Sequence, residues 1–310
     1  MINTSRRAFL LGAAATAAAS GCKSFGVPAT DENLTVFISD LHVRDEECHQ
    51  YQYLKGIVDD ILAMRPRPKN VVCFGDIAYT CGLEPEYRAS RKLLQRLVDA
   101  GMELTFGMGN HDRRSNFLKV WPEYRDRTLV PGKIVSLVNL GAVDLLMLDG
   151  LQGTDDRAEN DMGPVPGKLD QAQQEWLYKH LENLKRPTFL ASHFPLIEMR
   201  GTGRSLPSRF SEIPLLAGYI HGHDHRWQNE WEHFGWGQQG IYRRLCLPST
   251  GHWGDIGYTV FRVGEHQAVA EFVQKDFFFG WPAGPGEKRP VAWDDVLAER
   301  GASTICTFRY

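Results

Sequence analysis

The sequence contains no long run of basic residues. Its formal net charge is −3 at pH 7, and the lysines and arginines are spread along the 310 residues. Proteins that follow a nucleic-acid backbone carry basic stripes that neutralise phosphates. We therefore expect no nucleic-acid polymer as a partner. The bulk properties favour a small or singly charged substrate.

Cysteine pairs with C-x-x-C spacing are also missing, although six cysteines are present. If Cys22 is lipidated, five remain. An odd number without that spacing describes neither a disulfide framework nor a thiolate zinc site. Cys73 lies in an apolar stretch and is expected to be a small buried hydrophobic residue. One or two disulfides remain compatible with an oxidising compartment.

The N-terminus is typical of a targeting segment. Arg6 and Arg7 precede an apolar run that ends at Ala19 and is too short to span a membrane as a mature helix. Paired arginines before such a run indicate bacterial twin-arginine export, which carries folded proteins. Residues 19–22 also resemble a lipoprotein cleavage box that would anchor Cys22 in the membrane. Its first position is Ala rather than Leu, so plain signal-peptidase cleavage is the alternative. We expect a periplasmic or lipid-anchored protein and assign residues 1–30 to this segment and its linker.

Buried strands and amphipathic helices alternate in the next part of the chain. Residues 34–38 and 71–74 are continuous apolar runs, which are typical of strands buried on both faces. Helical spacing of apolar residues predicts helices over 53–62 and 85–100. A third strand follows at 104–106. Each strand ends just before a polar motif, the place where open α/β sheets put their sites.

The second half is richer in strands, and no internal repeat or low-complexity segment appears. Two mixed sheets covered by helices in one domain is the economical architecture. We assign residues 31–275 to this domain and 276–310 to a tail that packs on it. The expected elements are a hairpin of 134–140 and 143–149, a long loop over 150–167, a helix over 168–184, strands at 189–191, 219–220, around 231, 242–247 and 258–272, and a short helix near 293–300.

Five short polar motifs stand in order along the chain. Carboxylates, imidazoles and one amide oxygen together suit a hard or borderline metal ion. A His next to an Asp would also supply a proton donor and its orienting partner. The motifs are Asp40-Leu41-His42, Gly75-Asp76, Gly109-Asn110-His111-Asp112, Ser192-His193 and Gly222-His223-Asp224-His225.

This order of motifs resembles that of the calcineurin-like metallophosphoesterases, over residues 34 to about 272. The resemblance implies a four-layer α/β/β/α sandwich of two mixed β-sheets flanked by helices. It also implies two metal ions, with Fe, Mn or Zn best suited to the mixed ligands. The expected activity is hydrolysis of a phosphodiester or phosphomonoester by a metal-bridging hydroxide. Three groups of ligands follow from the family's pattern: Asp40, His42 and His225 for one ion, Asn110, His193 and His223 for the other, and Asp76 between them.

The same resemblance gives His111 a catalytic role. It would protonate the leaving oxygen or stabilise charge in the transition state, with Asp112 fixing its orientation. Two alternatives remain. Gly75-Asp76-Ile77-Ala78-Tyr79 also matches the purple acid phosphatases, whose Tyr binds ferric iron. Those enzymes carry Gly where His42 stands, which favours Tyr79 as a wall of the pocket. A non-catalytic, envelope-anchored binding module on the same fold is disfavoured by the intact ligand set.

Several other polar residues have two interpretations. His221 would be either an outer neighbour of the metal ligands or a hydrogen-bonded residue at a strand end. His252, with Trp253, would line the pocket or pack beside it. The nearby arginines would bind the substrate or, more commonly, form salt bridges on the surface. These are Arg113, Arg114, Arg200, Arg204 and Arg209.

Overall fold

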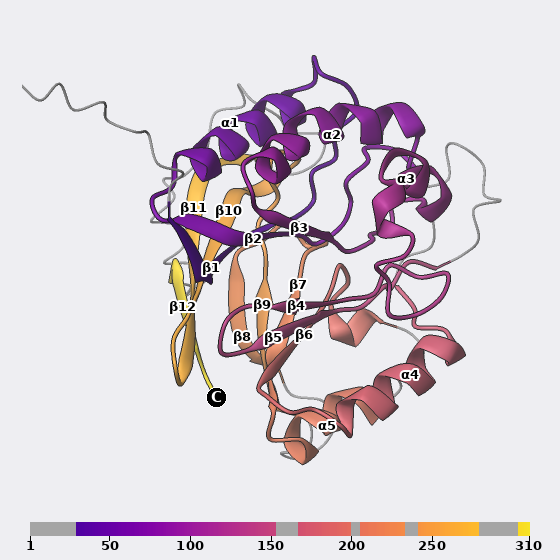
Figure 1. Cartoon of the computed structure of the whole chain (residues 1–310), viewed down its shortest axis with the longest axis vertical. Coiled ribbons are helices and arrows are strands. Elements are labelled where there is room, and N and C mark those ends of the chain that lie inside the picture. The colour runs from indigo at the N-terminus through magenta and orange to yellow at the C-terminus, as the bar shows by residue number, and fades with distance from the viewer. Residues whose placement is uncertain (1–28, 153–166, 200–204, 233–240, 279–302) are drawn as a thin grey trace, which may run out of the picture.

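Figure 1 shows the computed structural model, which describes residues 29–152, 167–199, 205–232, 241–278 and 303–310. Two six-stranded sheets face each other in the middle of the molecule. Helices α1, α2 and α3 lie on the outer side of the first sheet, and α4 and α5 lie on the outer side of the second. The expected four-layer α/β/β/α sandwich is confirmed.

The first sheet combines strands from both ends of the described chain. Its order is β12-β11-β10-β1-β2-β3, with β1, β2 and β3 parallel to one another and β10 antiparallel to β1. The expected C-terminal tail contributes an edge strand, because β12 pairs with β11. The strands are β1 (Thr30–Ile38), β2 (Arg67–Cys73), β3 (Glu103–Phe106), β10 (Gly254–Val263), β11 (Gln267–Phe278) and β12 (Ile305–Arg309).

The second sheet has the order β4-β5-β6-β7-β9-β8. Strands β5, β6, β7 and β9 are parallel, and an antiparallel strand closes each edge. The strands are β4 (Ser136–Asn139), β5 (Asp144–Met147), β6 (Thr188–Ser192), β7 (Leu216–His221), β8 (Gln228–Glu232) and β9 (Tyr242–Cys246).

The helices cover the two outer faces. Those on the first sheet are α1 (His49–Ala63), α2 (Glu84–Asp99) and α3 (Arg114–Val120), followed by the short 3-10 helix η1 (Pro122–Tyr124). Those on the second sheet are α4 (Gln171–Leu181) and α5 (Ser205–Glu212), with the 3-10 helix η2 (Leu196–Glu198) between them in sequence. No helix in the described part of the chain is long and apolar enough to cross a membrane.

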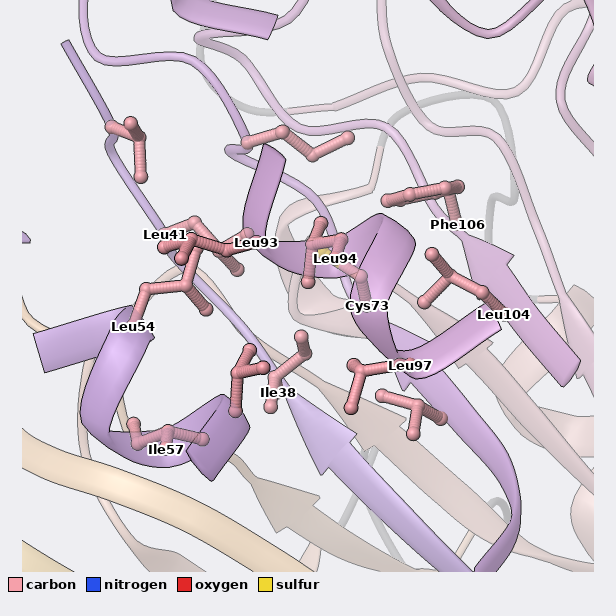
Figure 2. Close-up of a cluster of buried hydrophobic side chains, with 14 of the residues drawn as sticks. Ile38, Leu41, Leu54, Ile57, Cys73, Leu93, Leu94, Leu97, Leu104 and Phe106 are labelled. Carbon is pink, nitrogen blue, oxygen red and sulfur yellow. The ribbon is translucent and has the colours of Figure 1, made fainter. Parts of the chain in front are cut away.

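Alternation along the buried strands separates the core into layers. In β1, Val36 and Ile38 face the helices, whereas Phe37 faces the second sheet. Figure 2 shows the helix-side layer, which joins Leu54 of α1 and Leu94 of α2 to Ile38 of β1 and Cys73 of β2. Between the sheets, the Phe37 ring lies 4.8 Å from that of Phe261, measured between centroids. Both faces of the central strands are therefore buried, as their continuous apolar sequences predict.

The helices depart from the sequence prediction at single positions. Val98 is one of the apolar residues of the predicted helix over 85–100, but it is 38% exposed because it lies beside the buried stripe of Leu94 and Leu97. Trp176 of α4 is only half-buried, and Gln173 takes the buried position and hydrogen-bonds to the backbone at Asp149. Helices α3 and α5 were not predicted. The expected helix near 293–300 and most of the expected loop over 150–167 lie outside the described residues.

Candidate metal centre

The motif residues meet where strands of both sheets end. Those that follow β1, β2 and β3 come from the first sheet, and those that follow β6 and β7 come from the second. Their side chains line one cavity or pack directly beneath it. All nine residues singled out in the sequence are thus brought together: Asp40, His42, Asp76, Asn110, His111, Asp112, His193, His223 and His225.

Five of these residues have a left-handed backbone. Their φ angles are 53° for Asp40, 45° for His42, 48° for Asp76, 71° for His223 and 52° for His225. Within the described residues, these are the non-glycine positions with positive φ. Such a backbone is unfavourable for residues with a Cβ, and it persists where the surrounding structure imposes it, often at functional sites. The strained backbone turns each side chain toward the common centre.

Asp40, His42 and His225 form the first group of converging side chains. The Oδ1 of Asp40 lies 3.1 Å from Nε2 of His225 and 3.9 Å from Nε2 of His42. The two Nε2 atoms of the histidines are 3.4 Å apart. All three side chains are buried. One carboxylate oxygen and two ring nitrogens therefore surround a single point.

A second group forms around Asp76 and His193. The Nε2 of His193 lies 3.2 Å from Oδ2 of Asp76 and 3.2 Å from Nδ1 of His223. The same Oδ2 of Asp76 is 3.6 Å from Nε2 of His42, a member of the first group. Asn110 is buried and lines the cavity beside them. One oxygen of Asp76 thus lies between the two groups.

The spacing of these atoms suits metal ions. Nitrogen and oxygen ligands about 2.1 Å from a tetrahedral ion stand roughly 3.4 Å from one another. The observed separations of 3.1–3.9 Å bracket that value. The charge of the Asp40 side chain also suits a metal ion. Burial raises the pKa of Asp40, but His225 and His193 outweigh it, so the pKa is lowered and the carboxylate stays ionised. The residues therefore fit a pair of cations, and one oxygen of Asp76 faces both groups.

In Asp40 and Asp76, one carboxylate oxygen accepts hydrogen bonds from the surrounding chain, and the other faces the candidate metal centre. The Oδ2 of Asp40 accepts hydrogen bonds from the Ser39 hydroxyl (2.5 Å) and the backbone N–H of His223 (3.1 Å). The Oδ1 of Asp76 accepts one from the backbone N–H of His111 (2.7 Å). The other oxygen of each carboxylate faces the histidines. Backbone contacts thus fix the carboxylates in the orientation that a metal ion requires.

Two motif glycines make these contacts possible. A Cβ on Gly109 would lie 2.2 Å from Oδ1 of Asp76. A Cβ on Gly222 would lie 2.0 Å from the Ser39 hydroxyl oxygen and 2.7 Å from Oδ2 of Asp40. A side chain at either position would displace a carboxylate. The glycines are therefore required for close approach.

His111 is half-buried on the cavity wall, and its ring is held by the backbone. Its Nδ1 lies 2.7 Å from the carbonyl oxygen of Tyr79. The sequence-based expectation that Asp112 orients this ring differs from the observed hydrogen bonds. Asp112 is fully buried and accepts hydrogen bonds from the backbone N–H groups of Ile77 (3.1 Å), Ala78 (3.3 Å) and Gly109 (2.9 Å). Asp112 therefore joins the loop after β2 to the loop after β3 and acts as a positioning residue.

The cavity has a volume of about 590 Å³ and an aromatic wall. The ring of His252 lies 3.9 Å from that of His42, and the ring of Trp253 lies 4.5 Å from that of His225, measured between centroids. Both residues line the cavity, which resolves the two interpretations of His252. Tyr79 contacts His252 edge-on with centroids 5.6 Å apart.

Sequence reasoning missed Arg226 and chose other arginines instead. Arg226 is exposed and lines the cavity, and within the described residues its side chain makes no hydrogen bond or close ion pair. Its position directly after the last motif was the available signal. By contrast, Arg114 is held by Asp149 at 2.6 and 2.7 Å, and Arg209 pairs with Glu212 at 2.9 Å. Arg200 and Arg204 lie outside the described residues.

The cysteines and several histidines lie away from the candidate metal centre. Within the described residues all five cysteines are buried, and no disulfide forms among them. His180 stacks on Trp176 with ring centroids 5.0 Å apart, and His266 is exposed. His221 is buried, and its Nδ1 lies 2.8 Å from the carbonyl oxygen of Gly222.

Comparison with known proteins agrees with this geometry. The family model of the calcineurin-like phosphoesterases matches residues 34–227, a range that includes all nine residues named above. A dimetal phosphatase from Danio rerio has a similar structure, with a TM-score of 0.61 and 14% identity over 79% of this chain and 96% of that chain. The structure of PhoD gives a TM-score of 0.55 and 14% identity over 81% of this chain and 67% of that chain. At such identities the likeness shows the fold. No curated protein matches the sequence.

Proposed function

Because the chain belongs to the calcineurin-like phosphoesterase family, we propose that it hydrolyses a phosphodiester or a phosphomonoester with two bound metal ions. One observation carries this proposal. A single oxygen of Asp76 lies 3.2 Å from His193 and 3.6 Å from His42, which belong to two separate groups of metal-binding atoms. A shared carboxylate oxygen is what a pair of neighbouring ions requires.

The proposed ligands divide between two ions. Iron, manganese or zinc would suit the mixture of imidazole, carboxylate and amide groups. When bound, such ions would polarise the phosphoryl group and activate the attacking water. The first ion would be held by Asp40, His42 and His225, the second by Asn110, His193 and His223, and both by Asp76.

Residues of the chain would donate the proton to the leaving group and contact the substrate. In the imidazolium form of His111, Nδ1 donates to the carbonyl of Tyr79. The ring is then fixed, and Nε2 carries the proton that the leaving oxygen takes up. Asp76 accepts a hydrogen bond from the backbone N–H of His111, which places this ring beside the proposed metal ligands. Trp253 and His252 offer flat surfaces to the rest of the substrate.

Arg226 supplies a positive charge at the cavity wall. An exposed guanidinium that makes no hydrogen bond or close ion pair within the described part of the chain suits an anionic group of the substrate. Replacing Arg226 with Ala should raise the KM of p-nitrophenyl phosphate by about tenfold, because a charge-assisted contact is lost. Arg44→Ala is the matched control, since Arg44 is exposed and already pairs with Asp45 at 2.8 Å. Steady-state kinetics with equal KM values for the two variants would remove Arg226 from substrate binding.

Metal analysis and turnover on one sample test the whole proposal. The purified protein should contain at least two metal ions per chain and hydrolyse bis-p-nitrophenyl phosphate, p-nitrophenyl phosphate or both. The preferred compound shows the ester class. A folded protein that stays metal-free and inactive after reconstitution with manganese or iron would instead be a binding module on this fold.

We also propose export, on the sequence motifs alone. Arg6 and Arg7 support the twin-arginine route, and Cys22 supports a lipid anchor. Mass spectrometry of the protein from a membrane fraction would measure both features. A chain that retains residues 1–21 and lacks lipid would contradict them.

A further inference from the structure

A second group of metal-binding side chains lies at the ends of β7 and β9. His221 and Cys246 are paired neighbours on these parallel strands, and Asp224 follows in the loop after β7. A ring nitrogen of His221, a carboxylate oxygen of Asp224 and the sulfur of Cys246 all lie within 4.8 Å of one another. Their separation along the sequence hides this group from any search for short cysteine motifs.

This group lies on the other face of the second sheet from the inter-sheet core. Ile220 and Leu245 pack between the two sheets, and their neighbours His221 and Cys246 point the opposite way. Tyr219 and Tyr242, which share that outer face, pack in the layer beneath α4 and α5. The group is therefore distinct from the candidate dinuclear centre, although the loop after β7 contributes to both.

His221 has an unused ring nitrogen. The side chain is fully buried, and its Nδ1 lies 2.8 Å from the carbonyl oxygen of Gly222, which can only accept a hydrogen bond. The proton therefore resides on Nδ1, and Nε2 carries a lone pair. Within the described residues this buried Nε2 has no hydrogen-bond partner. A buried acceptor without a donor is unfavourable, and a bound cation would satisfy it.

We propose that His221, Asp224 and Cys246 bind a third metal ion, of the zinc type. Imidazole, carboxylate and thiolate are the three side-chain ligands of Zn²⁺, and a water molecule would complete four-fold coordination. The Cys246 thiol, which makes long contacts of 3.7 and 3.8 Å to the carbonyl oxygens of Gly222 and Leu247, would release its proton to solvent on binding. Asp224 also lines the large cavity, which gives an ion a path from solvent.

The neighbouring charges do not oppose this ion strongly. Arg244 acts electrostatically on all three residues, but its guanidinium is engaged by Glu230 at 2.9 Å and Glu232 at 2.8 Å. An ion bound here would fix the loop after β7 from its outer side. The same loop carries His223 and His225 toward the candidate dinuclear centre. The third ion would therefore have a structural role.

Cobalt substitution tests the proposal on the full chain. The protein is stripped with a chelator and reconstituted with Co²⁺, which gives a thiolate-to-metal absorption band only when sulfur is a ligand. We expect this band in the unaltered chain, and expect Cys246→Ser to lose it together with one cobalt ion per chain. Cys306→Ser is the matched control, because Cys306 is also a buried strand cysteine, 3.5 Å from the Arg243 guanidinium. It should retain both the band and the ion.

His221→Gln gives a second test that leaves every cysteine in place. It should also lose one ion, with circular dichroism showing an unchanged fold. Absence of the band in the unaltered chain, or its survival in Cys246→Ser, would overturn the proposal. Turnover of bis-p-nitrophenyl phosphate on the same samples separates this inference from the proposed activity. A thiolate band without turnover would support the third ion and contradict the phosphoesterase.

Discussion

The two buried aspartates of the centre each perform two tasks. In Asp76, Oδ1 accepts the backbone N–H of His111, and Oδ2 faces His42 and His193. Asp40 is arranged in the same way, with one oxygen toward the backbone of His223 and the other toward His225. An amide in place of either carboxylate would keep the shape but lose the charge that two cations require.

Asp76→Asn is therefore expected to weaken both ions together. We expect the affinity for metal to fall by at least about 100-fold, because even outer neighbours of a metal ligand contribute 10–100-fold. Metal content after gel filtration measures this loss. Asp59→Asn serves as the control, because Asp59 is exposed and pairs with Arg96 at 2.7 Å. Loss of one ion with retention of the other would contradict the bridging role.

His111→Ala tests the proton donor. Turnover of an alkyl phosphodiester should fall by about 10²–10⁴-fold, because a poor leaving group needs the proton. Turnover of bis-p-nitrophenyl phosphate should fall less, because nitrophenolate leaves without one. His42, Asp76 and His111 also form a group that could hold a metal, so metal content must be measured alongside. A variant that loses an ion would make His111 a ligand.

At the scale of elements, the centre depends on how closely the loops approach one another. Asp112 accepts hydrogen bonds from backbone N–H groups in the loops after β2 and β3. Gly222, which has no side chain, lets the loop after β7 approach Asp40 closely. The strands deliver the ligands to one edge, but these contacts set the final distances. Gly222 and the buried carboxylate of Asp112 are thus as necessary to the centre as the proposed ligands.

Gly222→Ala should lower stability and metal affinity together. Its Cβ would displace Ser39 and Asp40, at a cost of about 1–3 kcal/mol in the free energy of unfolding. Gly56→Ala is the matched control, because a Cβ on this glycine of α1 has no atom within 4 Å. That change should stabilise the protein by about 0.5–1 kcal/mol, since alanine favours a helix. Chemical denaturation measures both, and a neutral Gly222→Ala would show that the loop adapts.

The strands and the polar motifs could be predicted from the sequence, whereas the contacts between loops could not. Strands β1 and β2 were predictable because buried parallel strands are continuous apolar runs. That the polar motifs meet was predictable because their order is distinctive. The link from Asp112 to Ile77 and Gly109 was not, since backbone N–H groups carry no signal of residue type. The left-handed φ of His42 could not be predicted either, because neither histidine nor its sequence neighbours favour that backbone conformation. Helix α3 is short, with no side-chain cap to mark its start.

On the scale of the whole molecule, the centre joins the two halves of the sandwich. Asp40 and Asp76 follow strands of the first sheet, whereas His193 and His225 follow strands of the second. Bound ions would therefore hold the sheets together in addition to the apolar layer between them, where the rings of Phe189 and Phe261 lie 5.5 Å apart. Metal binding and folding stability should be coupled.

Chelation should accordingly lower the melting temperature, and added metal should restore it in a concentration-dependent way. At a free metal concentration 100 times the Kd, each site adds about 2.7 kcal/mol to stability. Differential scanning fluorimetry measures the shift. Asp76→Asn should respond much less to added metal. Equal shifts for the variant and the unaltered chain would show that the ions bind elsewhere.

The pairing of β1 has a consequence for the order of events during synthesis. One side of β1 pairs with β2, which follows soon after it, and the other side pairs with β10, so that Leu34 lies opposite Arg262. The ribosome makes β10 long after β1, and until then one edge of β1 has no partner. The turn after β1 carries Asp40 and His42, and Ser249, just before β10, donates its hydroxyl to the carbonyl of Asp40. The centre can therefore form only after translation has passed β10, and any metal loading would follow chain elongation rather than accompany it.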